Sequence, residues 1–130
     1  SDAIDLNVLG FWHELLDPKK RSSWPHCHSE DEEFCYILKG HPQVWMNGYV
    51  KTLQPGDLVY FEPGTSLSHT LINSGDEVVE YLGWGISGDL TPEDTLFYPL
   101  HPERNKECES KGMLWSEYKR PDDFGDHLGE

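Results

Sequence analysis

Residues 33–61 read EFCYILKGHPQVWMNGYVKTLQPGDLVYF, a run of short extended segments separated by turn residues. Asn47-Gly48 stands between two of these segments, and this dipeptide is a strong hairpin signal because it tolerates positive φ at both turn positions. Gly40 and Gln54-Pro55-Gly56 mark two further turns. The pattern predicts four strands joined by tight turns, over residues 33–38, 43–46, 49–53 and 58–61.

The same pattern extends to both sides of this stretch, and almost no segment has helical spacing. Further strands are predicted over residues 11–16, 24–28, 68–72 and 78–84. About eight short strands with hairpin turns are typical of an all-β fold. We expect a single antiparallel β-barrel or jelly roll, because closure removes the strand edges that would otherwise invite aggregation.

The chain changes character after Gly85, where charged residues mix with scattered aromatic ones. Thr91-Pro92-Glu93-Asp94 resembles the start of a helix. We expect the barrel to occupy residues 1–88 and an irregular C-terminal tail, residues 89–130, to wrap around it. The end of the tail, residues 120–130, contains Pro, Gly and four acidic residues without a period, so we expect it to be mobile.

The composition indicates one acidic domain. A chain of 130 residues can enclose one hydrophobic core, and its formal net charge of −14 opposes binding to nucleic acid or to anionic lipid. No apolar run approaches the roughly 20 residues that a membrane span needs. Cys27, Cys35 and Cys108 are widely spaced without a CxxC pair, which favours reduced thiols and a cytoplasmic location.

Three histidines and one glutamate form the candidate site. His26 and His28 are two residues apart, so in a strand their side chains share one face, about 7 Å apart at the backbone. Glu33 begins the next predicted strand, and His69 lies in a later one. If the barrel closes, the four can converge inside it on one divalent transition metal, Fe, Mn, Ni or Zn, for which imidazole and carboxylate ligands are suited.

Glu32 is an alternative to Glu33 as the carboxylate, and strand parity favours Glu33. With Glu33 inward, Cys35 and Ile37 also point inward, where the buried Cys35 acts as a small hydrophobic side chain. The opposite, apolar face then carries Phe34, Tyr36 and Leu38. A second sheet, the tail or a second subunit must cover that face, and we expect a homodimer.

Two motifs resemble those of the cupin superfamily. Pro25-His26-Cys27-His28, four residues, Glu33, six residues and Gly40 resemble the first motif. Gly56-Asp57, five residues, Pro63-Gly64, four residues, His69, three residues and Asn73 resemble the second. The resemblance covers residues 24–73 closely, and it implies that His26, His28, Glu33 and His69 are metal ligands and that Gly40, Gly56 and Gly64 occupy turns.

The resemblance implies metal-assisted chemistry without naming the reaction, because one fold hosts many functions. The leading hypothesis is an enzyme acting on a small, polar, oxygen-bearing molecule, either as a sugar or sugar-phosphate isomerase or as an Fe(II) dioxygenase. The alternative is a binding or sensing module without turnover, since no acid or base beyond the ligands stands out. A sugar phosphate would need basic groups in the pocket, for which the candidates are Arg21, Lys39, Lys51 and Arg104.

Aromatic residues are more numerous than a small barrel interior needs. They can line a pocket mouth, or form the core and a subunit interface, and the sequence leaves both open. The residues in question are Trp45, Tyr60, Phe61, Tyr81 and Trp84.

Overall fold

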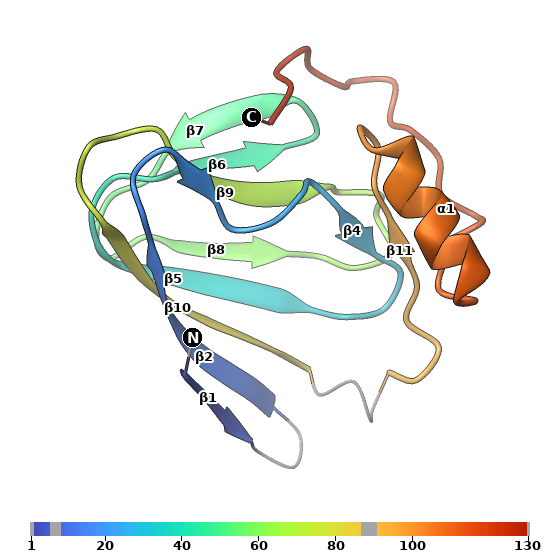
Figure 1. The fold of residues 1–130 in the computed structure, drawn as a ribbon, viewed down its shortest axis with the longest axis horizontal. Coiled ribbons are helices and arrows are strands. Elements are labelled where there is room, and N and C mark those ends of the chain that lie inside the picture. The colour runs from blue at the N-terminus through green and yellow to red at the C-terminus, as the bar shows by residue number, and fades with distance from the viewer. Residues whose placement is uncertain (1, 6–8, 87–90, 130) are drawn as a thin grey trace.

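The computed structural model describes residues 2–5, 9–86 and 91–129, which form two facing antiparallel sheets (Figure 1). One sheet has the strand order β1-β2-β10-β5-β8, the other has the order β3-β9-β6-β7, and β11 pairs separately with β4. The predicted antiparallel jelly roll is confirmed, in an open form, since the two sheets do not join into one closed barrel within these residues. The strands are β1 Asp2–Asp5, β2 Leu9–Leu16, β3 Lys20–Arg21, β4 Cys27–His28, β5 Glu33–Lys39, β6 Gln43–Met46, β7 Tyr49–Thr52, β8 Leu58–Phe61, β9 His69–Asn73, β10 Val79–Ile86 and β11 Leu96–Phe97.

Alternation along the strands builds the core between the sheets. Along β10 every second residue is buried, and along β5 Cys35 and Ile37 are buried as the parity of Glu33 predicts. Side chains from both sheets meet in one hydrophobic cluster between them. The cluster consists of Leu16, Cys35, Ile37, Val44, Leu53, Phe61, Leu71, Val79 and Tyr81.

The hairpin predicted at Asn47-Gly48 is present. It joins β6 to β7, and both turn residues have positive φ, 46° and 87°. The end of the chain lies against this turn: Gly125 donates its backbone N–H to Asn47 O at 2.8 Å, and Trp45 Nε1 donates to His127 O at 2.8 Å. The mobility of residues 120–130 stays a prediction.

The tail contains a helix, α1, over Pro102–Ser110. The helix start predicted at residues 91–94 was wrong, because Pro92-Glu93 form a turn and the Asp94 carboxylate accepts N–H groups from residues 30 and 31 instead of capping a helix. Within the described residues no helix is long and apolar enough to cross a membrane. The boundary predicted between residues 88 and 89 lies outside the described residues, so the division into barrel and tail stays a prediction.

The strand predicted over residues 24–28 is shorter than expected. Only Cys27–His28 are in β4, which pairs with β11, and residues 22–25 form a bend. Pro25 has no N–H to donate, which keeps this segment out of a continuous ladder. His26 nevertheless makes an isolated bridge with His69, so the segment reaches the second sheet at that point.

Candidate metal centre

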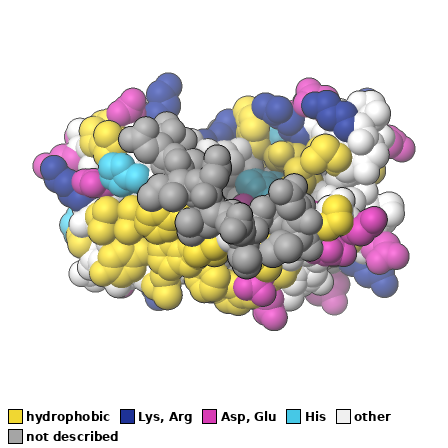
Figure 2. All heavy atoms as spheres, turned by 90° about the horizontal axis from the view of Figure 1, so that it is seen from below, with side chains coloured by type: hydrophobic (Ala, Val, Ile, Leu, Met, Phe, Trp, Pro, Cys, Tyr) yellow, Lys and Arg dark blue, Asp and Glu magenta, His cyan; other side chains and the backbone are white. Residues whose placement is uncertain are grey.

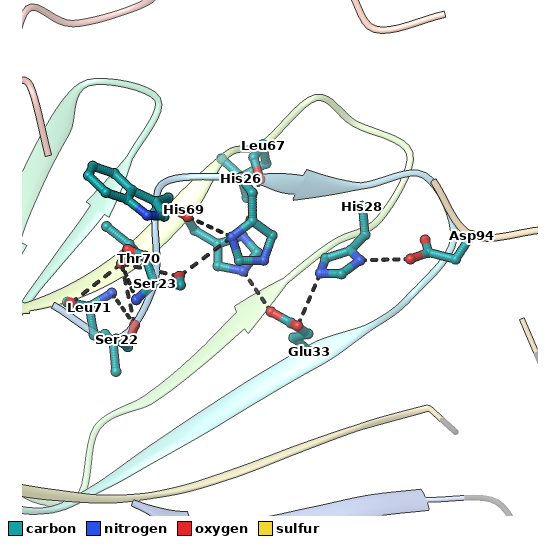
Figure 3. A network of polar contacts seen from close by, with 11 residues as sticks. Ser22, Ser23, His26, His28, Glu33, Leu67, His69, Thr70, Leu71 and Asp94 are labelled. Atoms are coloured by element: carbon teal, nitrogen blue, oxygen red, sulfur yellow. Dashed lines mark hydrogen bonds and ion pairs between the residues drawn. The ribbon is translucent and has the colours of Figure 1, made fainter. Parts of the chain in front are cut away.

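The four predicted site residues come from three strands, β4, β5 and β9, and from His26 just before β4. His26 exchanges backbone hydrogen bonds with His69, the first residue of β9, at 3.3 and 2.9 Å. His28 ends β4, and Glu33 starts β5 in the other sheet. Figure 3 shows the Glu33 carboxylate between His69 on one side and His28 on the other. The fold therefore brings together all four residues that the motifs selected.

The distances show how the four side chains are arranged around the carboxylate. Glu33 Oε2 lies 2.7 Å from His69 Nε2, and Oε1 lies 3.2 Å from His28 Nε2. The His26 ring centroid is 5.0 Å from that of His28 and 5.1 Å from that of His69. One donor atom each of His26, Glu33 and His69 lies within 4.8 Å of the others. His28 and His69 are further apart, with ring centroids separated by 6.5 Å.

Each imidazole has an acceptor beside its Nδ1 atom. His26 Nδ1 lies 2.7 Å from Trp24 O, His28 Nδ1 lies 2.8 Å from Asp94 Oδ2, and His69 Nδ1 lies 3.3 Å from Leu67 O. A ring that donates from Nδ1 keeps its Nε2 lone pair free, which is how second-shell acceptors orient metal-binding histidines.

The Nε2 atoms of His28 and His69 then face carboxylate oxygens with a lone pair on each side. His28 Nε2 is also buried without a hydrogen-bond partner. Such an arrangement needs positive charge between nitrogen and oxygen, either a second proton on the ring or a cation. One divalent cation held by three imidazoles and a carboxylate would satisfy all of these atoms, so the residues fit a transition metal.

The pKa values of these side chains also indicate that the Glu33 carboxylate needs a positively charged neighbour. Burial, with the charges of His69 and His28, lowers the pKa of His26 to about 4. Burial alone would lower the pKa of His28, but its hydrogen bond to Asp94 and the adjacent Glu33 carboxylate outweigh burial and raise the pKa to about 10. Burial would raise the pKa of Glu33, but the contacts from His28 and His69 hold it far below its usual range. Glu33 is thus a carboxylate that requires a positive neighbour.

Asp94 is a member of the site that the sequence did not reveal. Its Oδ2 accepts from His28, and its Oδ1 accepts the backbone N–H groups of Glu30 and Asp31 at 2.9 and 3.0 Å. His28, Asp31 and Asp94 also form a second group of donor atoms within 4.8 Å of one another. Asp94 lies outside both motifs and 66 residues from His28, so no local spacing could have identified it.

A cavity of about 380 Å³ opens beside His26, Glu33 and His69. Its wall also contains Glu14, which the sequence did not single out, and Tyr81, which the sequence named only among the aromatic residues. Arg21 contributes to the wall, whereas the lining within the described residues includes none of Lys39, Lys51 and Arg104.

The aromatic residues divide between the two roles that the sequence left open. Trp45 is fully buried in the core, while Phe61 and Tyr81 are inward-facing residues that line the cavity. Tyr60 and Trp84 lie on the outer face of the five-stranded sheet, where each packs against Phe34.

Two facing antiparallel sheets with histidines and a glutamate at one end of the interior define a jelly roll with a candidate metal centre. The sequence profile of the cupin domain matches residues 12–85, so the chain belongs to the cupin family. No curated protein matches the chain.

Solved structures support the same fold. A candidate sugar phosphate isomerase from Acidithiobacillus ferrooxidans is 27% identical, with a TM-score of 0.66, over 76% of this chain and 59% of that one. A sugar phosphate isomerase of the cupin superfamily from Silicibacter pomeroyi is 28% identical, with a TM-score of 0.67, over 72% and 57%. The chain therefore spans less than two thirds of either protein.

A salicylate 1,2-dioxygenase from Pseudaminobacter salicylatoxidans is similar in fold alone. It is 16% identical, with a TM-score of 0.62, over 70% of this chain and 26% of that one.

Proposed function

We propose that this cupin is a metal-dependent enzyme acting on a small, polar, oxygen-bearing molecule, with a sugar phosphate as the leading substrate class. One observation carries the proposal: three imidazoles, each with an acceptor at Nδ1, surround a single carboxylate at the wall of a cavity. The identity of 27% and 28% with two proteins named for sugar phosphate isomerisation supports the substrate class.

The residues that would hold the metal are His26, His28, Glu33 and His69, and the ion would be Fe, Mn, Ni or Zn. When bound, such an ion supplies a Lewis acid that polarises a carbonyl or hydroxyl oxygen. Sugar isomerisation also moves a proton between neighbouring carbons, which requires a base and a hydrogen-bond donor near the substrate.

Glu14 and Tyr81 are the residues suited to that proton transfer. They are register partners on β2 and β10 and both line the cavity. The Glu14 carboxylate can accept a proton from a substrate carbon. Burial raises the pKa of Tyr81, so its Oη–H stays protonated and can donate to a substrate oxygen.

Elemental analysis of purified protein tests the metal centre. We expect one equivalent of a transition metal in the native chain and none in a His26→Ala/His28→Ala variant, because two ligands are removed together. Circular dichroism should still report β structure in the variant, and His41→Ala is the control. A full equivalent of metal in the double variant would contradict the assignment.

Turnover assays on the metal-loaded chain separate the two enzyme classes from the alternative. Interconversion of aldose and ketose phosphates supports the isomerase, and uptake of O₂ by an iron-loaded chain supports a dioxygenase. Recovery of an unchanged, stoichiometric ligand after long incubation supports a binding or sensing module.

We also propose that the chain forms a homodimer in the cytoplasm. Four aromatic side chains form a ladder across β2, β10, β5 and β8 on the outer sheet face, with successive centroid separations of 6.1, 5.6 and 4.8 Å. They are Phe11, Trp84, Phe34 and Tyr60. Figure 2 shows hydrophobic side chains gathered on the underside of the molecule. A second copy could cover such a face with an identical one.

A further inference from the structure

A second cleft, of about 640 Å³, lies beside the metal cavity and has a basic lining. It is lined by Lys19, Lys20, Arg21, Trp24, Ile72, Asn73 and Ser74, a set without an acidic side chain among the described residues. Lys19-Lys20-Arg21 is the only run of three basic residues in a chain with a net charge of −14. Positive charge is therefore concentrated at this cleft, whereas the chain as a whole repels anions.

Arg21 is half-buried in the cleft and held in a fixed orientation. Its guanidinium carbon lies 3.5 Å from the centroid of the Trp24 ring, and Nη1 donates to Gly129 O at 3.3 Å. Stacking on an aromatic face leaves the in-plane N–H groups of a guanidinium available for two-pronged binding of an oxyanion.

The neighbouring cations also keep unused donors: Lys19 Nζ donates one N–H to Ser74 O at 2.6 Å, and an ammonium group carries three. Lys19 pairs at 3.2 Å with Asp76, whose side chain is 94% exposed, so this ion pair is weak. Within the described part of the chain, no ion pair occupies Lys20 or Arg21. The cleft thus offers an oriented guanidinium and two ammonium groups.

Arg21 is in the lining of both the basic cleft and the cavity beside His26, so the two spaces are neighbours, and the Arg21 guanidinium lies against Trp24 and Gly129. We propose that the basic cleft binds the phosphate group of a phosphate-ester ligand, with Arg21 as the residue that fixes it. This inference deepens the proposed function, because it assigns the residues that would select a phosphorylated substrate.

Titration with inorganic phosphate at constant ionic strength tests the subsite, in the full chain and in an Arg21→Gln variant. We expect saturable binding to the native chain and at least about tenfold weaker binding to the variant, because charge-assisted hydrogen bonds are lost. The matched control is Arg120→Gln, whose guanidinium likewise stacks on an aromatic ring, that of Phe124, at 3.8 Å. This control should bind phosphate like the native chain.

Metal content measured on the same samples separates this inference from the proposed function. Equal phosphate affinity in the native chain and Arg21→Gln, or no saturable binding to the native chain, would overturn the subsite even if the metal is present. If the native chain binds phosphate through Arg21 but contains no metal, the subsite is supported and the proposed metal-dependent activity is contradicted. Should Arg21→Gln lower the melting temperature, Lys20→Gln on the exposed side of the cleft carries the test, with an expected loss of about threefold.

Discussion

The Asp94 carboxylate accepts hydrogen bonds from three donors, and one of them is a predicted metal ligand. The two backbone N–H groups of Glu30 and Asp31 fix its position, and the third contact, at 2.8 Å, sets the orientation of the His28 ring. Only 13% of the Asp94 side chain is exposed, so water competes little for these bonds. A residue of the C-terminal segment thereby holds a side chain of the first cupin motif in place.

Removing this carboxylate should weaken metal binding without unfolding the protein. We predict that Asp94→Ala lowers metal affinity about 10- to 100-fold, the usual cost of losing an acceptor behind a ligating histidine. Asp94→Asn, which keeps an acceptor oxygen, should lie between this variant and the native chain. Competition with a chelator of known affinity measures the effect, and the exposed tail residue Asp122 provides the control variant Asp122→Asn. An affinity for Asp94→Ala within twofold of the native value would show that Asp94 does not position His28.

The site residues differ in how far the sequence could reveal them. Strand parity predicts that His26 and His28 share one face and that Glu33 points inward with Cys35 and Ile37 in the next strand. His69 required the second motif, because only the closing of the fold brings β9 beside them. Asp94 contacts His28 from a distant segment, and no periodicity in the sequence indicates such a contact.

The strand β10 shows how glycine shapes the cavity. Gly83 faces inward opposite Trp12 on β2, and a Cβ built there would lie 2.3 Å from the Trp12 ring. Trp12 lines the cavity, so the missing side chain at Gly83 lets the indole lie flat over the strand. Gly10 on β2 differs, because its nearest neighbours would be 3.9 Å from an added Cβ.

We predict that Gly83→Ala lowers the free energy of unfolding by about 1–3 kcal/mol, since an added methyl group must displace the indole ring or the backbone. Gly10→Ala should change it by less than about 0.5 kcal/mol, because the site is open and the backbone is ordinary. Urea denaturation of both variants measures the difference. Equal stability of Gly83→Ala and the native chain would mean that Trp12 has room to move aside at no cost.

Strands with clear alternation and turn residues were predictable, and short ones were not. The hairpin of β6 and β7 and the long strands β2, β5 and β10 follow from local pattern and turn chemistry. The two-residue strands β4 and β11 exist because they pair with each other, which is a property of the tertiary structure. The helix α1 could not be predicted from an apolar face, because Cys108 is its one buried residue among those described.

The outer face of the five-stranded sheet carries apolar side chains and is not covered by the second sheet. Leu15 on β2 and Leu58 on β8 are 61% and 56% exposed on this face, and the aromatic ladder crosses the same strands in a neighbouring row. The ladder side chains pack against one another across the strands, so they can meet a partner without first becoming ordered.

We predict that the native chain sediments as a dimer and that Leu15→Lys/Leu58→Lys sediments as a monomer. Both leucines are already largely exposed, so their replacement costs the monomer little, whereas two lysines per copy would place like charges in a buried interface. Leu128→Lys is the control, because Leu128 is 62% exposed and lies outside this sheet. Sedimentation velocity over a range of concentrations gives the result, with circular dichroism to verify the fold. A monomeric native chain, or a double variant that stays dimeric, would show that this face does not join two copies.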